Sequence, residues 1–397
     1  MKNRSIPLFK VYMSKKASAN VAKVLDSGFI GEGPQVKAFE EELSHFFKAH
    51  HSNKDIVTVN SATSAEHLIY HMLKSNRTLV ETYEWGSATT NWPALEPTDE
   101  VLTSALTCTA TNWPIVNNGI KLKWVDVDPL TLNMCAKSLE ERIDENTRII
   151  SIVHWGGNPA DMEAIEIVVR KAEKKYGRPI AIIEDCAHSF GGKYPDGQYI
   201  GFRGNFATFS LQAIKHITSV DGGFIVSPYK TFTTEAKLLR WYGIDREGPR
   251  SDFRCEADVK EAGFKFHMND VSAAVGRANL AEADKILPAY TSNANYYNEA
   301  LKDVDGVTLI PRKGQPGYWL YSMHVERRDE FMKYMSDNGV ATSRVHERND
   351  KHTCTADFVT NLPGVDRAVS SMISIPVGFW VEKEDREYIV DLIKKGW

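Results

Sequence analysis

The stretch EDCAHSFGGKYPDGQYIGFRGNFATFSLQAIK, from Glu184 to Lys215, decides the fold of this chain. It overlaps an apolar run, Pro179 to Cys186, that is typical of a buried parallel strand and that contains two adjacent carboxylates near its end. A second short strand is expected from Asn205 to Leu211, and one lysine, Lys215, follows it in a turn that ends at Gly222 and Gly223. Because ligands of such sheets sit beyond the carboxyl ends of the strands, the acids and the lysine are expected at one shared site.

An acid at one strand end and an isolated lysine after another suit the chemistry of pyridoxal 5'-phosphate (PLP). The lysine holds the cofactor as a Schiff base, and the acid keeps the pyridine nitrogen protonated so that the ring accepts electrons. Because strand side chains alternate between faces, only one of Glu184 and Asp185 is expected to point toward Lys215. Burial is expected to lower the pKa of Lys215, which suits a nucleophile and proton carrier.

These motifs resemble the sugar aminotransferases of the StrS/DegT type, within the aspartate-aminotransferase-like PLP fold. The similarity runs from IPLF at Ile6 to DREYIVDLI ending at Ile393, and it includes the acid strand, FS-x4-K and the following GG in order. The resemblance implies a PLP-dependent aminotransferase with Lys215 as the Schiff-base residue. It also implies Asp185, rather than Glu184, as the partner of the pyridine nitrogen, and a homodimer with the active site at the interface.

Short β-rich runs alternate with amphipathic stretches over the first 230 or so residues, which predicts an α/β fold with helices on both faces of a mostly parallel sheet. The large PLP-binding domain is expected to contain a mixed, seven-stranded sheet, and a smaller α+β domain is expected to follow. The expected strands are Ile56–Ser61, Glu100–Thr107, Leu122–Asp128, Arg148–Trp155, Pro179–Cys186, Asn205–Leu211 and Gly222–Pro228.

The domain boundaries are predicted from the change of pattern near residue 246. We expect an N-terminal arm over 1–20, the large domain over 21–245, and the small domain with an interface segment over 246–397. Helical spacing predicts one helix over Asp161–Gly177 and a long helical segment over Asn269–Val304.

Arg77–Thr98 is longer than the corresponding stretch of the family. Its turn formers and the tryptophans Trp85 and Trp92 fit two interpretations. It is either a surface excursion packed on its own aromatics or a loop that contributes to a substrate pocket or dimer contact.

The cofactor phosphate is expected at the start of a helix. In NSATSAEHL, Thr63 and Ser64 would present N–H groups and hydroxyls at the positive helix end. By resemblance this is the family's phosphate loop, with Ala62 in place of the usual glycine, and Ser210 matches the family's phosphate-binding serine.

The family also sends a segment across the dimer interface to the partner's phosphate. The matching stretch here is Gly263–Asp270, where Lys265 replaces the usual asparagine and His267 the usual arginine. Lys265 of the partner subunit is therefore expected to neutralise the phosphate as a point charge.

The environment of the cofactor ring is less well defined by the sequence. His188 occupies the position where relatives place Gln or His near the ring oxygen, although a lone histidine is more often structural. Cys108 occupies the position of the usual stacking aromatic, so Trp113 or a tryptophan of the insertion is expected to compensate, or Cys108 belongs to the core.

Substrate contacts are expected from two segments. His154 and Trp155 follow a strand in HWGGN, and Arg344 and His346 lie in the charged run Ser343–His352. The charged run suits a diphosphate or a sugar carboxylate, but it also fits a solvated surface. Asp126 and Asp128 do not complete a ligand set, so no metal is expected.

Composition limits the remaining possibilities. The formal net charge is −4, and no long basic block occurs, so nucleic acid is not an expected partner. No apolar run approaches the roughly 20 residues that cross a bilayer, so no membrane contact is expected. Five scattered cysteines favour reduced thiols in the cytoplasm.

The resemblance implies transfer of an amino group from L-glutamate to a keto sugar, and the first expected acceptor is a nucleotide-linked keto-deoxysugar for surface polysaccharide or lipopolysaccharide biosynthesis. The alternative acceptor is a nucleotide-free keto sugar acid such as an 8-keto octulosonic acid. A PLP sugar dehydratase would have histidine instead of Lys215, and His216 is only adjacent. A non-catalytic PLP-binding homologue stays open, whereas the glycines of Gly28–Pro34 do not form the GxGxxG of an NAD-dependent dehydrogenase.

Overall fold

The structure is a computed structural model that describes residues 4–49, 55–83, 86–246, 248–249, 252 and 258–397. Trp85 and Cys255 lie outside the described residues, and with them the expectations that concern these two side chains. Within the described part of the chain, no helix is both long and apolar enough to cross a membrane.

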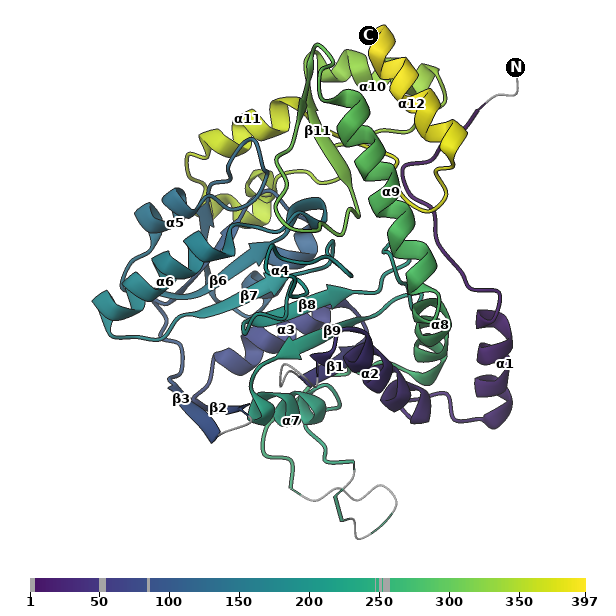
Figure 1. The fold of residues 1–397 in the computed structure, drawn as a ribbon. Coiled ribbons are helices and arrows are strands. Elements are labelled where there is room, and N and C mark those ends of the chain that lie inside the picture. The colour runs from purple at the N-terminus through teal and green to yellow at the C-terminus, as the bar shows by residue number, and fades with distance from the viewer. Residues whose placement is uncertain (1–3, 50–54, 84–85, 247, 250–251, 253–257) are drawn as a thin grey trace.

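A seven-stranded sheet forms the centre of the molecule, in the order β1-β9-β8-β7-β6-β4-β5 (Figure 1). Neighbours from β8 to β5 are parallel, whereas β9 runs antiparallel to both β1 and β8. The predicted α/β fold with a mostly parallel seven-stranded sheet is confirmed, and each expected strand overlaps an observed one. The strands are β1 (Asp55–Val59), β4 (Glu100–Ser104), β5 (Lys121–Val125), β6 (Thr147–Val153), β7 (Ala181–Asp185), β8 (Phe206–Ser210) and β9 (Gly223–Ser227).

Side chains of the central strands alternate between two apolar cores, one on each face of the sheet. Ile183 of β7 belongs to the core formed with α3 (Ala62–Leu73), α4 (Thr109–Asn117) and α7 (Lys230–Leu239). Its neighbour Ile182 belongs to the core formed with α2 (Pro34–Phe46), α5 (Ala136–Arg142) and α6 (Met162–Tyr176). The sheet is therefore covered on both faces, as the continuous apolar strand runs predict.

The C-terminal part adds a small antiparallel sheet in the order β10-β11-β12. Helices α10, α11 and α12 accompany these strands near the C-terminus (Figure 1). The elements are β10 (Val307–Leu309), β11 (Tyr321–Val325), β12 (Met372–Ile375), α10 (Arg328–Asp337), α11 (Pro363–Ser371) and α12 (Lys383–Lys395).

The long helical segment predicted over Asn269–Val304 is two helices, α8 (Asp270–Leu280) and α9 (Ala283–Leu301). Side chains at the break are held by the N-terminal segment: Asn279 Oδ1 accepts the N–H of Ser14 at 2.8 Å, and the Glu282 carboxylate accepts the Ser14 hydroxyl at 2.6 Å. These tertiary contacts outweigh the local preference for one continuous helix.

The N-terminal segment runs along the C-terminal part before it enters α1 (Ala17–Ser27), which packs on α8. Ile6 forms a bridge with Val340, and the Trp380 indole donates to the carbonyl of Pro7 at 2.8 Å. The chain ends therefore stabilise one another although they are far apart in sequence.

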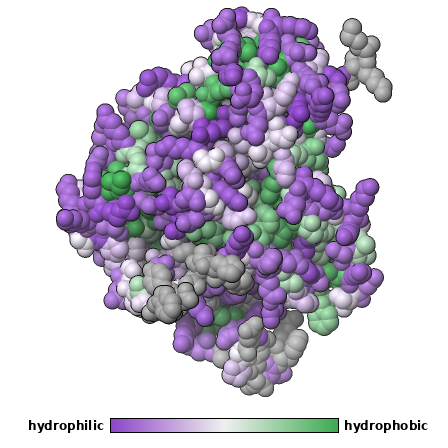
Figure 2. Space-filling model, viewed as in Figure 1, coloured by the Kyte–Doolittle hydropathy of each residue, from purple (hydrophilic) through white to green (hydrophobic). Residues whose placement is uncertain are grey.

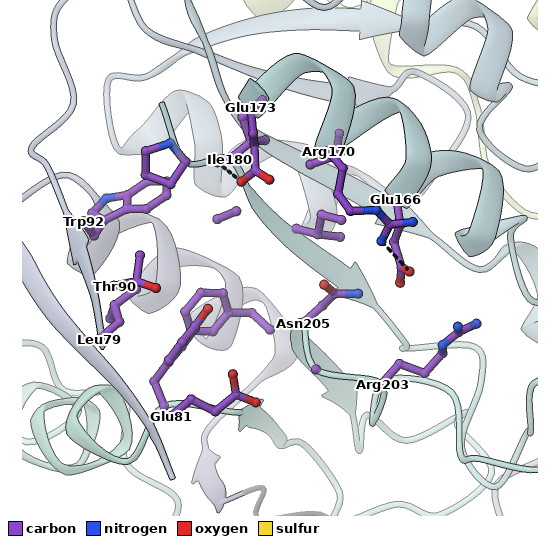
Figure 3. Close-up of a pocket in the computed structure, with 17 residues that line it drawn as sticks. Leu79, Glu81, Thr90, Trp92, Glu166, Arg170, Glu173, Ile180, Arg203 and Asn205 are labelled. Atoms are coloured by element: carbon purple, nitrogen blue, oxygen red, sulfur yellow. Dashed lines mark hydrogen bonds and ion pairs between the residues drawn. The ribbon is translucent and has the colours of Figure 1, made fainter. Parts of the chain in front are cut away.

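The insertion forms a β-hairpin of β2 (Arg77–Tyr83) and β3 (Gly86–Trp92). Trp92 anchors it, because its indole N–H donates to the carbonyl of Leu73 at 2.6 Å and the Arg148 guanidinium lies 4.8 Å from its ring. A cavity of about 460 Å³ lies between the hairpin, α6 and the starts of β7 and β8 (Figure 3). The hairpin therefore lies at the opposite end of β7 from Asp185.

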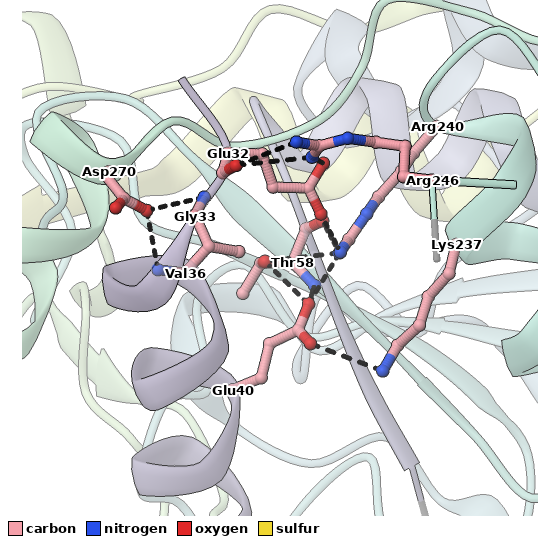
Figure 4. Close-up of polar contacts among 9 residues, drawn as sticks. All are labelled: Glu32, Gly33, Val36, Glu40, Thr58, Lys237, Arg240, Arg246 and Asp270. Atoms are coloured by element: carbon pink, nitrogen blue, oxygen red, sulfur yellow. Dashed lines mark hydrogen bonds and ion pairs between the residues drawn. The ribbon is translucent and has the colours of Figure 1, made fainter. Parts of the chain in front are cut away.

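A buried ion-pair network joins β1, α2 and α7 (Figure 4). The Arg240 side chain, only 5% exposed, contacts Glu40 at 2.6 Å, Glu32 at 2.5 Å and the carbonyl of Thr58 at 2.8 Å. Burial opposes ionisation of Glu40, but Arg240 and Lys237 lower its pKa below 4.5 on balance. The ion pairs of Glu40 therefore stabilise the fold fully above pH 4.5, and this stabilisation is lost as the pH falls through the lower pKa of Glu40 in the folded protein.

Arg240→Met is expected to lower the free energy of unfolding by about 3–5 kcal/mol, because it leaves buried carboxylates without their partner. Urea unfolding at neutral pH measures this loss. Lys237→Met removes the exposed partner of the same Glu40 carboxylate and is expected to cost less than about 1 kcal/mol. Equal losses in the two variants would contradict the assignment.

Candidate active site

Asp185 lies at the carboxyl end of β7, on the sheet face that α3 and α4 cover. Its Oδ2 accepts the Thr111 hydroxyl at 2.6 Å, and its Oδ1 accepts the N–H of Ala187 at 2.9 Å. Thr111 is itself held by the Thr107 hydroxyl at 3.0 Å. Both carboxylate oxygens are therefore fixed in a site that is 7% exposed.

Glu184 faces the other side of the sheet, as alternation requires. Its carboxylate accepts hydrogen bonds from Tyr194 and Asn205 and pairs with His154 Nε2 at 3.0 Å. His154 Nδ1 accepts the N–H of Ala160 at 3.0 Å. The structure therefore places His154, expected to contact substrate, in a fully buried polar cluster with Glu184 and away from the Asp185 face.

This polar cluster includes the three side chains whose ligand atoms come within 4.8 Å of one another, His154, Glu184 and Cys186. The Glu184 oxygens already have partners, and burial raises the pKa of the Cys186 thiol well above its ordinary value. The cluster is therefore a hydrogen-bonded part of the core.

Lys215 lies in the turn that follows β8. Its Nζ is 3.3 Å from the centroid of the Trp319 ring, whose indole N–H donates to the carbonyl of Ile214 at 2.9 Å. Burial lowers the pKa of Lys215 from 10.5 to about 7, although the Asp185 carboxylate acts in the opposite direction. The amine can therefore gain and lose a proton near neutral pH.

Aromatic rings gather beside the Lys215 amine. The His188 ring stacks on Trp319 with centroids 4.1 Å apart, and His346 lies parallel to His188 at 5.5 Å. Trp155 meets both imidazoles edge-on, at 6.3 and 5.8 Å, and Phe9 stacks on the Trp319 ring at 5.0 Å. The structure therefore brings the predicted residues His188, Trp155 and His346 together around Lys215.

The two imidazoles near Lys215 are uncharged at neutral pH. Burial, followed by the charge of Lys215, lowers the pKa of His188 well below 6.5 and that of His346 to about 3. His346 Nε2 is buried without a hydrogen-bond partner among the described residues. A ligand that offers a donor or acceptor there would satisfy this nitrogen.

The start of α3 meets the beginning of β9 next to Ser210. Ser61 caps α3 by accepting the N–H of Ser64 at 3.1 Å, and Ser210 pairs with Gly223 across β8 and β9. A Cβ on Gly223 would lie 2.5 Å from the N atom of Ala62, so this close approach requires glycine. Ser64, Ser210 and the exposed Thr63 thus lie on adjoining segments, as a phosphate site requires.

Cys108 is the residue before α4 and lies near enough to Lys215 to affect its titration. Trp113, expected as a substitute stacking residue, instead packs edge-on against His352 at 5.5 Å. Trp92 lies in the hairpin. The tryptophan at the Lys215 amine is Trp319, which no sequence motif had indicated.

The predicted phosphate residue Lys265 lies exposed on the surface, with its Nζ 4.3 Å from the Trp241 ring of the same subunit. Arg344 is 37% exposed and contacts Glu347 at 3.3 Å. Neither side chain has a described contact with Asp185 or Lys215.

Two non-glycine residues next to the cluster have left-handed backbone, Tyr318 with φ 55° and Val345 with φ 69°. This conformation is unfavourable for β-branched and bulky residues and concentrates at functional sites. Tyr318 and Val345 directly precede Trp319 and His346, so the strain lies where the aromatic cluster is positioned.

Known proteins resemble this chain over nearly its whole length. The model of the DegT/DnrJ/EryC1/StrS aminotransferase family matches residues 11–394. The crystal structure of AtS13 from Actinomadura melliaura is 38% identical, with a TM-score of 0.91 and coverage of 100% of both chains. The sugar aminotransferase CalS13 from Micromonospora echinospora is 37% identical, with a TM-score of 0.89 and coverage of 99% of this chain and 100% of that chain.

A more distant structure shows the fold alone. Spr1654 from Streptococcus pneumoniae, solved in a PLP form, is 23% identical, with a TM-score of 0.83 and coverage of 98% of both chains.

Competitive labelling of the folded protein with acetic anhydride is expected to show that Lys215 becomes reactive as the pH rises through about 7, because burial favours its neutral amine. Mass spectrometry of the Lys215 peptide across pH gives the midpoint. The unfolded protein is the control, with an expected midpoint near 10.4. Asp185→Asn removes a charge that raises the pKa of Lys215, so the midpoint of the folded variant should be lower than that of the folded wild type. An ordinary midpoint, the same in the folded wild type and the folded variant, would contradict this coupling.

Proposed function

Because the chain belongs to the DegT/DnrJ/EryC1/StrS aminotransferase family, we propose that it moves an amino group from L-glutamate to a nucleotide-linked keto-deoxysugar, with PLP as cofactor. The protein is an aminotransferase, and 37% identity to CalS13 supports a sugar as its acceptor. One observation carries the proposal: β7 and β8 are parallel neighbours, so the fixed Asp185 carboxylate and the turn that holds Lys215 lie at the same edge of the sheet. The product would serve surface polysaccharide or lipopolysaccharide biosynthesis.

The donor set of this site suits PLP. When bound, PLP supplies an aldehyde that condenses with amines and a protonated ring that accepts electrons from the carbon that loses its proton. Ser64, Thr63 and Ser210 would hold its phosphate with hydroxyls and first-turn N–H groups, which have no partner within the helix. Asp185 would hold the ring nitrogen, and His188 the ring oxygen.

Lys215 would provide the covalent anchor and carry the proton. A pKa of about 7 leaves a substantial fraction of the amine neutral, so Nζ is available as nucleophile. The same Nζ, once released by a substrate amine, can take a proton and return it, as base and then as acid. The uncharged His188 and His346 beside it would not compete for that proton at neutral pH.

The acceptor would bind on the outward side of the aromatic cluster. Arg344 is half-buried next to this cluster and suits an anionic group such as a diphosphate. His346 Nε2, buried without a described partner, would hydrogen-bond the sugar. Trp155 is 2% exposed and would position His188 and His346 rather than contact substrate over a wide area.

A homodimer would complete the site. Phe29, Ile30 and Val220 are large apolar side chains that are 76%, 53% and 56% exposed. The carbonyl of Gly31 accepts the N–H of Asp270, which begins α8 just after the Lys265 segment. Figure 2 shows apolar atoms at the lower right, over the region of α1 and α8. A second subunit on this face would receive Lys265 near its phosphate site.

The cytoplasm is the compartment that we propose for this dimer. Cys108, Cys135, Cys186 and Cys354 are free thiols, and this state suits a reducing environment.

Lys215→Ala is expected to abolish transfer from L-glutamate and to prevent borohydride from attaching PLP to the chain. Asp185→Asn should keep attachment but lower turnover by roughly 10²–10⁴-fold, because a neutral partner no longer favours the protonated ring. Lys137→Ala, on an 84% exposed side chain, is the matched control and should behave as wild type. Retained transfer in Lys215→Ala, measured by glutamate consumption, would refute the assignment.

Mixed dimers test the role of Lys265. Lys215→Ala and Lys265→Met, each defective alone, are unfolded and refolded together. If Lys265 acts in the partner's site, half of the dimers carry one intact site and the mixture should regain up to about a quarter of wild-type activity.

The control mixture pairs Lys215→Ala with the double variant Lys215→Ala/Lys265→Met, which contains no intact site in any combination. A first mixture that never exceeds the sum of its separate components would show that Lys265 does not act across the interface.

A further inference from the structure

Glu66 is a carboxylate buried on the helix face that covers Asp185. It lies in the second turn of α3 within the apolar sequence ATSAEHLIYHML and is only 2% exposed. Tyr70, one turn later on the same face, is fully buried as well. A carboxyl group at such a position is costly unless it is neutral or paired, so its presence requires a reason.

Glu66 is connected by one hydrogen bond to β8, the strand beside that of Asp185. Its Oε1 accepts the Thr208 hydroxyl at 2.6 Å, and Thr208 is the residue of β8 that pairs with Asp185 of β7. Neighbours in register on parallel strands point to the same face, so Thr208 lies beside Asp185. Glu66 Oε2 is buried without a hydrogen-bond partner among the described residues.

The hydrogen bonds decide which of the two carboxyl groups is charged. Both oxygens of Asp185 accept donors, from Thr111 and Ala187, and the Lys215 amine is near. Glu66 has one donor and an unpaired Oε2. Two neighbouring buried carboxyl groups do not both ionise, so the proton belongs to Glu66 and the charge to Asp185.

Electrostatics agree with this division. Burial, followed by the charge of Asp185, raises the pKa of Glu66 well above 4.5. The other titratable side chain on the α3 face beside Glu66 is Tyr70, and burial raises its pKa well above its ordinary value. The Cys186 thiol lies on the other face of the sheet, and burial raises its pKa as well. Both are therefore neutral, and Asp185 is the charge that Glu66 meets.

We propose that Glu66 is a positioning residue of the cofactor site, whose neutral carboxyl, held by Thr208 beside Asp185, leaves Asp185 as the anion of this buried pair. If Glu66 were the ionised member of the pair, the proton would lie on Asp185, and a neutral Asp185 would hold a cationic ring nitrogen less strongly. A simple apolar side chain would leave the Thr208 hydroxyl unpaired next to Asp185. The inference rests on the proposed function, because it assigns Asp185 to the PLP ring.

Titration of PLP into the apo-protein, followed by visible absorbance, gives the dissociation constant in each variant. Glu66→Gln keeps a neutral group that accepts from Thr208 and should leave the constant within about threefold of wild type. Glu66→Leu should weaken binding by about tenfold, because it leaves a buried hydroxyl unpaired. Thr208→Val removes the other end of the same hydrogen bond and should weaken binding in the same direction, which keeps the test decisive if Glu66→Leu does not fold.

Infrared difference spectra provide a readout that does not depend on the cofactor. The wild-type minus Glu66→Gln spectrum of the apo-protein at neutral pH should contain the C=O stretch of a protonated carboxylic acid. A carboxylate band in its place, or a tenfold loss of PLP affinity in Glu66→Gln, would show that Glu66 is ionised and would overturn the proposal. Wild-type affinity in both Glu66→Leu and Thr208→Val would remove the positioning role.

Asp185→Asn separates this inference from the proposed function. If Asp185→Asn weakens PLP binding and the Glu66 and Thr208 variants do not, only the role of Glu66 fails. If Asp185→Asn itself binds PLP as tightly as wild type, the assignment of Asp185 to the ring fails, and the proposed function loses its support.

Discussion

The fixed orientation of the Asp185 carboxylate is the constraint on which the active site depends. Thr111 and the N–H of Ala187 occupy one oxygen each, so the carboxylate cannot rotate toward the other face of the sheet. Its charge influences the titration of Lys215 on the next strand end and of Glu66 behind it. One hydrogen-bonded anion therefore organises a nucleophile on one side and a neutral acid on the other.

The sheet supplies this geometry because it brings strand ends together. β7 and β8 are parallel neighbours, and their carboxyl ends place Asp185 and the Lys215 turn at one edge. Close packing of Gly223 on Ala62 then brings the start of α3 to the same place. The Arg240 network holds β1, whose end leads into α3, against α2 and α7, so buried charge on one side of the sheet supports the phosphate site.

Much of this arrangement could be predicted from sequence because strand runs and strand ends leave clear patterns. Lys215, Asp185 and Ser210 follow apolar runs directly, and alternation separates Asp185 from Glu184. Alternation alone does not place His154 in the same way, because the face of its side chain depends on the pairing of β6 with β7. Val153 pairs with Asp185, so the next side chain turns to the Glu184 face.

Contacts between distant segments could not be predicted in this way. The break between α8 and α9 depends on Ser14, and the ring against Lys215 comes from Trp319, more than a hundred residues away. Glu66 did leave a local signal, an acid within a helical apolar face, but its partner Thr208 belongs to another segment. The first strand of the hairpin also has a local sequence signal, since Arg77–Tyr83 is rich in strand-forming residues.

The protonation state of the cofactor's ring nitrogen tests the central claim most directly. PLP labelled with ¹⁵N in the ring is bound to the wild-type protein and to Asp185→Asn, and the nitrogen chemical shift is measured by NMR at neutral pH. We predict a protonated nitrogen in the wild type and an unprotonated one in the variant. An unprotonated nitrogen in the wild type, or the same shift in both proteins, would contradict the role of Asp185.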